Sequence, residues 1–470
     1  MTTPATTDPT PATPPEAAAW DKPKRFAMIA AVAGLALLGV LGGMSVAGAE
    51  GEKAKEAAVS QVMLSYLTGF VFWASLPLGG LALLMIGYTT KTSWGLLLRR
   101  PLEAATRTLP LLVLLWVPLA IGVATGAASP YWWSHPHTAH APEGTTGDPK
   151  GALEKGDKSD KRALTEKVGK EMIAKTIKEA VERAHHEERD ERMHALYGYL
   201  TPGGYVVVGL VMFAIYGYMI FVLNKRGQSI QDDASKARPV LEGLHKFSGV
   251  GLIVYAITTT SAASQWVMST EPSWSSTMFP VIFAVNQFLT CFAFCLALFL
   301  FIVSKPPFAA VMRPKFQLDM GTLLLAFTLF WSYTSFSQFM LIWIGNLPEE
   351  IPFYLKRSAG GWWYVSAALI ALHFALPFLL LLFRDIKLHP KRLRVVAMYL
   401  LVICAIDVTW WIEPTTVKHT SFPFWLLDVG SILGIGGLFG MVFFWQLSKR
   451  PILPTNETFM LPEGHHHEHH

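Results

Sequence analysis

The stretch Leu329–Leu355, LFWSYTSFSQFMLIWIGNLPEEIPFYL, joins an apolar helix to an abrupt exit from it. Hydroxyl and amide groups run along the helical half, at Ser332, Tyr333, Thr334, Ser335, Ser337 and Gln338. Lipid offers no hydrogen bonds, so these groups are expected to face protein or water. Joining helices is the common role for such groups. The stretch therefore predicts a membrane helix inside a larger helical assembly.

The composition of the whole chain agrees with this prediction. Its 470 residues are 52% hydrophobic, and the mean hydropathy is +0.36. Several apolar runs reach the roughly 20 residues that span a bilayer. The fold class expected is an all-α polytopic membrane protein.

Redox and nucleotide chemistry find little support in the sequence. The chain has three cysteines and no CxxC pair, so covalent haem, iron–sulfur and metal ligation lack a basis. Among fifteen histidines only His373 falls deep in an expected span, and a bis-histidine haem needs two. No phosphate-binding loop or nucleic-acid module is present in the sequence. We expect no cofactor and no metal in this chain.

The sequence predicts ten membrane spans. The domains expected are a disordered N-terminus at 1–25, three spans in 26–127, a long loop with an amphipathic helix at 128–199, seven spans in 200–447 and a tail at 448–470. The spans are Phe26–Gly48, Gln61–Tyr88, Arg107–Thr125, Leu200–Leu223, Phe247–Val267, Phe279–Ser304, Met320–Gly345, Trp363–Phe383, Val395–Ile412 and Phe424–Leu447. Ala47–Ala49 also fits a signal-peptide cleavage site, but the apolar run before it is longer than usual and favours a retained helix.

Basic residues set the expected orientation. They crowd the loops on the side of the N-terminus and are few in the short loops opposite. Because basic loops stay in the cytoplasm, both termini are expected there, in the cytoplasmic (inner) membrane of a bacterium. The loop at 128–199 then lies in the periplasm.

The segment Asn346–Leu355 leaves the membrane on the periplasmic side in this topology. Pro348 and Pro352 restrict its backbone, and Glu349 and Glu350 make it negative. Such a loop can pair with a basic partner. Glu349 and Glu350 are therefore candidates for a partner contact or a rigid gate.

Four ionisable residues in or beside the last spans suggest a proton path. His373, Asp407 and Asp428 lie within expected spans, and Glu413 lies at the mouth of one. Charges in lipid are costly, so such residues usually face the bundle interior and are functional candidates. Their order by depth predicts an outer half-path from His373 through Asp407 and Asp428 to Glu413. A structural hydrogen-bond network is the alternative.

Hydroxyl groups could support waters in an inner half of the same path. The candidates are Thr258 and Ser261 in the fifth expected span and Thr328 and Ser332 in the seventh. Asn286 and Thr290 also share one helix face at a spacing of four residues. Contacts between helices remain the commoner role for such residues.

Several segments resemble one family. FSQFMLIWIGNLPEEIPFYL at Phe336–Leu355 resembles the hallmark of the ActF subunit (quinone-binding subunit 2) of bacterial alternative complex III, in the NrfD-type membrane protein superfamily. Similar stretches are RRPLEAATRTLPLL at Arg99–Leu112, QWVMSTEPSWSSTMF at Gln265–Phe279, LHFALPFLLLLFRD at Leu372–Asp385 and LSKRPILP at Leu447–Pro454. Departures from the family pattern are Gln265, where Asp is usual, and Ser273, where His is usual.

The resemblance implies a fold and an assembly. The fold would be two four-helix bundles, spans 2–5 and 6–9, with spans 1 and 10 at the periphery. The chain would be a subunit without its own redox centre in a quinol:electron-acceptor (cytochrome c) oxidoreductase of the respiratory chain. Haem c, iron–sulfur clusters and quinol would belong to partner subunits, one of them a related NrfD-type membrane protein.

Two other functions stay open from the residues alone. Prolines and acids within the spans give some support to a secondary transporter, whose helices often break around a substrate site. The third interpretation is a purely structural membrane anchor of a respiratory complex.

Overall fold

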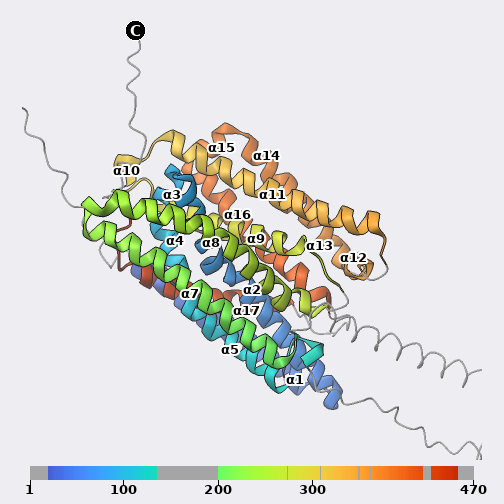
Figure 1. Cartoon of the computed structure of the whole chain (residues 1–470). Helices are drawn as coiled ribbons and strands as arrows, with labels where there is room; N and C mark the ends of the chain where they lie inside the picture. Colours follow the sequence, from blue (N-terminus) through green and yellow to red (C-terminus); the bar gives the residue numbers. More distant parts are fainter. Residues whose placement is uncertain are drawn as a thin grey trace, which may run out of the picture.

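The chain folds as an assembly of long helices (Figure 1). The computed structural model describes residues 20–126, 128–134, 200–271, 274–306, 308–347, 350–358, 361–415 and 425–453. Every element within these ranges is helical, and none is a strand. The expectation of an all-α polytopic membrane protein is confirmed at this level.

The long helices follow the expected order. They are α1 (Asp21–Ala47), α2 (Glu52–Thr90), α5 (Leu109–Thr125), α7 (Pro202–Asp232), α8 (Ala237–Trp266), α9 (Phe279–Ile302), α11 (Pro314–Gly345), α16 (Pro390–Ile412) and α17 (Trp425–Leu447). Short helices join them: α3 (Ser93–Leu97), α4 (Arg99–Thr106), α10 (Phe308–Val311), α12 (Ile351–Ser358) and α15 (Arg384–Leu388). One further span is composite: α13 (Trp362–Ala368), the π-helix η5 (Leu369–Ala375) and α14 (Leu376–Leu382).

Nine helices of the described part are long and apolar enough to cross a membrane. Each of the ten segments expected as a span lies on a helix. The nine helices that meet the criterion of length and apolar character do not include α11. It is 32 residues long, but its hydroxyl and amide groups dilute its apolar character. α11 nevertheless packs against α9 and α14 within the bundle.

The exit after α11 differs from the expected loop. The chain turns at Asn346, which has a positive φ of 48°, and is helical again from Ile351 to Ser358. Pro352 is compatible with this helix because it occupies the first turn, where backbone N–H groups have no helical partner. The segment Asn346–Leu355, expected as a loop, therefore ends in a helix, and Pro348 and Glu349 lie outside the described residues.

Helix α2 occupies the centre. It packs against α8, α9 and α17 and is the most buried span, with nine-tenths of its apolar window inside the protein. α9 in turn packs against α11 and α16. This arrangement brings side chains of α9, α11, η5 and α16 to one interior region.

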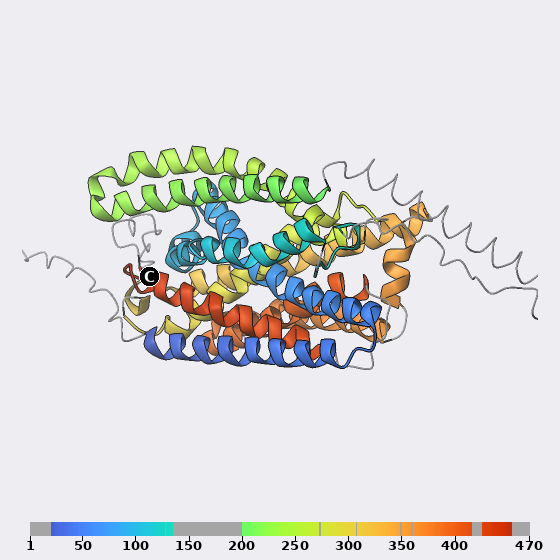
Figure 2. The same cartoon turned by 90° about the horizontal axis from the view of Figure 1, so that it is seen from below.

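Glycines let α1 lie directly against α17, as Figure 2 shows for the blue and red helices. A Cβ on Gly34 would meet the backbone nitrogen of Gly434 at 2.1 Å, and one on Gly437 would meet that of Ala31 at 2.1 Å. Membrane helices associate through such small residues because backbones can then approach closely. α1 is thus held closely against α17.

Candidate functional site

A buried His–Asp group lies between four helical elements. The Nδ1 atom of His373 in η5 is 3.9 Å from Oδ2 of Asp407 in α16. The same oxygen accepts hydrogen bonds from Nε1 of Trp331 at 2.8 Å and Nδ2 of Asn286 at 2.9 Å. His373 and Asp407 are 0% and 1% exposed, so this carboxyl group is reached only through protein.

The imidazole of His373 is held on two sides. Its ring stacks on the indole of Trp331 with 3.6 Å between the ring centroids. Its Nε2 atom lies 3.7 Å from Sγ of Cys404, while Nδ1 makes no hydrogen bond within the described residues. A buried polar atom without a partner suits a group that exchanges partners, such as a proton carrier.

The helix carrying His373 is irregular at this residue. Residues Leu369–Ala375 form a π-helix, and Pro377 follows four residues after His373. Proline has no N–H to donate to the carbonyl of His373, which favours a local change of helix geometry. π-Helical turns inside α-helices are frequent at functional sites.

A second buried group contains two acids. Glu413 begins the short helix η6 (Glu413–Thr415), and Asp428 lies in the first turn of α17. Oε2 of Glu413 accepts a hydrogen bond from Nε2 of Gln61 at 2.7 Å, and Oε1 accepts one from Ser65 at 3.4 Å. Asp428 lies close to Glu413 and Ser65, although neither of its carboxylate oxygens makes a hydrogen bond within the described residues. Two carboxyl groups in contact readily share a proton, because two negative charges side by side repel.

Helix α16 connects the two groups. Asp407 and Glu413 are six residues apart, or roughly 9 Å at the rise of an α-helix. The structure thus brings His373 to Asp407 and Glu413 to Asp428. The expected order by depth, from His373 through Asp407 and Asp428 to Glu413, stays a prediction.

The four hydroxyl groups proposed for the inner half do not form one chain. Thr258 and Thr328 donate to carbonyl oxygens of their own helices, at Val254 (2.9 Å) and Leu324 (2.9 Å). Ser261 does the same and lies toward the outside of α8. Ser332 is half-buried, with no hydrogen bond to another described residue. Serine and threonine often bond back to their own helix, so their sequence pattern alone does not show a path.

Tyrosines instead make the buried polar contacts between α7, α8 and α9. Tyr216 in α7 pairs with Thr259 at 3.3 Å. Tyr255 in α8 donates to Oε1 of Gln287 in α9 at 2.7 Å. Neither tyrosine stands out in the sequence, because tyrosine is common in membrane helices without a polar partner.

A buried ion pair lies near the exit after α11. Glu271, 4% exposed, pairs with Lys356 and, at 3.6 Å, with Nη1 of Arg357. Arg357 is 1% exposed and donates to the carbonyl oxygens of Phe353 (2.7 Å), Trp410 (3.0 Å) and Trp411. Burial lowers the pKa of Arg357 to about 10, and Glu271 opposes that shift, so the guanidinium stays charged at neutral pH.

The expectation that Glu349 and Glu350 contact a partner or form a gate stays a prediction. Glu350 is half-buried, whereas Glu271 is the acid that meets the basic residues of α12. Sequence reasoning missed Glu271 and Arg357 because 86 positions separate them and neither lies in an apolar run. Their positions could have drawn attention to them: Glu271 lies within the quoted stretch Gln265–Phe279, and Arg357 lies two residues after the stretch Phe336–Leu355.

A second charged cluster lies at the other end of the bundle. Glu103 in α4, 1% exposed, is surrounded by Arg99 (3.4 Å), Arg100 (2.7 Å), Arg107 (3.5 Å) and Arg450 (3.0 Å). We call these five residues the arginine cluster. Arg450 follows α17, so the cluster joins the segment before the third expected span to the segment after the last one.

Comparisons with known proteins do not identify a family for this chain. A scan against protein-family models finds no match, and a search of curated proteins finds no relative. The likeness to one family therefore rests on the quoted stretches, several of which carry the buried groups described above.

Proposed function

We propose that this chain is an integral membrane subunit of a quinol:electron-acceptor (cytochrome c) oxidoreductase of the alternative complex III type. It has no redox centre of its own and supports proton transfer through His373 and Asp407, continued by the pair Glu413–Asp428. The observation that carries this proposal is the wholly buried His373–Asp407 contact beside a π-helix. Intramembrane ionisable pairs of this kind mark proton relays.

The architecture supports a finer version of the fold. Counting α11, ten helices span the membrane, in two four-helix bundles. The first would be α2, α5, α7 and α8, and the second α9, α11, α13–α14 and α16. α1 and α17 would be peripheral. The packing of α2 on α8 and of α9 on α16 fits this division.

The expected partners are the other subunits of that complex. Haem c, iron–sulfur clusters and the quinol would be held there, one partner being a related NrfD-type membrane protein. Surfaces for partners would include the exit after α11. The complex would sit in the cytoplasmic membrane of a bacterium.

Purification in mild detergent tests the assembly. A tagged form of the chain is expected to bring down a multi-subunit particle with the visible absorption of haem c. Quinol-dependent reduction of an electron acceptor should co-elute with it. A stable single-chain particle that moves a solute in proteoliposomes would instead establish the secondary transporter. If the complex keeps its activity after every substitution at the buried groups, the chain is a purely structural membrane anchor.

The orientation is tested by labelling. Trp20 stacks on Phe444 at 5.9 Å between ring centroids, so the described chain begins and ends at one end of the bundle. An even number of spans follows if each long helix crosses. Cysteines introduced at Lys236 and Lys387 should resist a membrane-impermeant reagent in intact cells. One at Lys170, which lies outside the described residues, should react. Labelling of position 387 alone would overturn the count of ten.

A further inference from the structure

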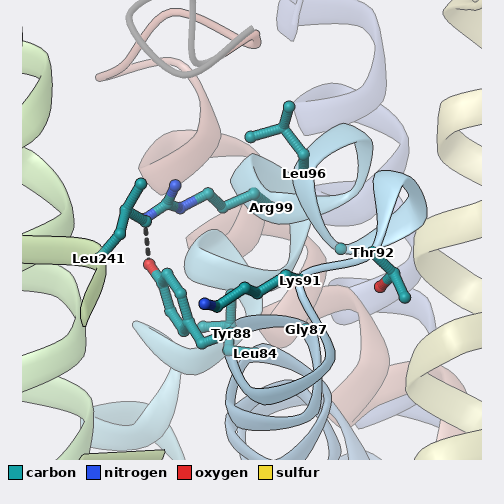
Figure 3. Close-up of a pocket in the computed structure, with 9 residues that line it drawn as sticks. Leu84, Gly87, Tyr88, Lys91, Thr92, Leu96, Arg99 and Leu241 are labelled. Carbon is teal, nitrogen blue, oxygen red and sulfur yellow. Dashed lines mark hydrogen bonds between the residues drawn. The ribbon is translucent and has the colours of Figure 1, made fainter. Parts of the chain in front are cut away.

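A small pocket opens where α2 ends and the chain turns back through α3 and α4. It is lined by Leu84, Gly87, Tyr88, Lys91, Thr92, Gly95, Leu96, Arg99 and Leu241. Figure 3 shows the side chains of Tyr88, Lys91 and Arg99 around its polar side. The pocket is small, with a volume of about 40 Å³, and it is partly open to solvent. It lies far from the His373–Asp407 and Glu413–Asp428 groups along the chain and shares no residue with them.

The polar side of the pocket is positively charged. Arg99 donates to the hydroxyl of Tyr88 and lies over its ring, with Cζ 4.6 Å from the centroid. Behind Arg99 is the arginine cluster, whose four guanidinium groups share the one carboxylate of Glu103. Among these five side chains, four positive charges less one negative charge leave three positive. Lys91 adds a further cation at the mouth.

Lys91 is held in an unusual backbone conformation. It ends α2 with φ 51° and ψ 41°, in the left-handed region. Glycine or asparagine usually fills this position after a helix, because a side chain there is strained. Its N–H still bonds to the carbonyl of Gly87 at 3.0 Å, as a helix end requires. Strained backbone positions of this kind often occur at ligand-binding sites.

The other side of the pocket is apolar. Leu84, Leu96 and Leu241 come from three helices, α2, α3 and α8. The site lies at the end of α2, one of the helices long and apolar enough to cross a membrane, so phospholipid headgroups are expected near it. A phosphate diester with an attached glycerol would place its charge on Lys91 and Arg99 and its carbon atoms on the leucines. Basic pockets between helices are a known means of holding anionic headgroups.

We propose that this pocket binds the phosphate of an anionic phospholipid headgroup. Lys91 and Thr92 meet the headgroup from the solvent side, and Arg99 meets it from inside. Binding holds the α2–α3 turn against α8 and stabilises the end of the bundle that contains the arginine cluster. The proposal is independent of the oxidoreductase activity.

Equilibrium binding of short-chain lipids tests the proposal. The protein would be purified as isolated, in whatever complex it forms, and titrated with dihexanoyl phosphatidylglycerol, dihexanoyl phosphatidylcholine and inorganic phosphate. We expect phosphatidylglycerol to bind most tightly. Lys91→Asn should weaken its binding about fivefold, the effect of one basic residue at the headgroup level. Asparagine accepts the left-handed backbone, so this variant loses the charge without added strain.

Two variants make the result specific. Lys305→Gln removes an exposed lysine from the turn before α10, outside the pocket lining, and should leave binding unchanged. Lys91→Arg should retain most of it. Equal binding of phosphatidylcholine, or no effect of Lys91→Asn, would overturn the proposal. Inorganic phosphate binding as tightly as phosphatidylglycerol would show a free-anion site and would also overturn it.

Discussion

In the proposed oxidoreductase, replacing Asp407 with asparagine is expected to slow quinol oxidation about a hundredfold, the low end of what a positioned proton-transfer group contributes. The fold should survive, because the amide oxygen of the introduced asparagine can still accept from Trp331 and Asn286, as Asp407 does at 2.8 and 2.9 Å. The substitution removes only the proton-binding carboxylate. Turnover and proton release in proteoliposomes are the measurements.

His373→Ala should give the same loss by removing the other member of the pair. It also removes the stacking on Trp331, so the yield of intact complex must be measured alongside turnover. Asp385→Asn is the matched control, since Asp385 is an exposed aspartate of α15 that pairs with Arg392 of α16. Wild-type turnover and proton release in both variants would exclude the path. Failure of both variants to assemble would show that the residues are structural.

Arg357→Met is expected to be the most destabilising single change outside the spans, costing about 3–5 kcal/mol of unfolding free energy. The change leaves Glu271 buried with Lys356 as its remaining cation. It also leaves the carbonyls of Phe353, Trp410 and Trp411 without their donor. Breaking a buried pair is costly because the surviving charge stays out of water.

Unfolding in mixed micelles of mild detergent and dodecyl sulfate would measure this cost. Lys356→Met is the matched control: Lys356 is 31% exposed, and a partly exposed pair contributes about 1 kcal/mol or less. The double variant Glu271→Gln with Arg357→Met should regain part of the loss, because it removes both buried charges. Equal loss in Lys356→Met and Arg357→Met would contradict the role assigned to Arg357.

Most of the long helices can be predicted from the sequence alone. A run of about 20 apolar residues must satisfy its own backbone hydrogen bonds in lipid, so run length predicts a helix with little ambiguity. It also identified His373, Asp407, Asp428 and Glu413, because an ionisable residue in such a run is rare enough to stand out. The boundaries were less well predicted, as α12 at Ile351–Ser358 shows, since polar helices next to the membrane lack that signal.

The contacts among these residues depend on how the helices pack together. Asp407 receives its hydrogen bonds from α9 and α11, and Glu413 receives one from Gln61, 352 positions away. In a soluble protein an apolar stripe shows which face of a helix is buried. A membrane helix is apolar on the lipid side as well, so its sequence does not reveal which face meets a neighbour. For that reason Trp331, Glu271, Arg357 and the arginine cluster emerged only when the helices were packed together.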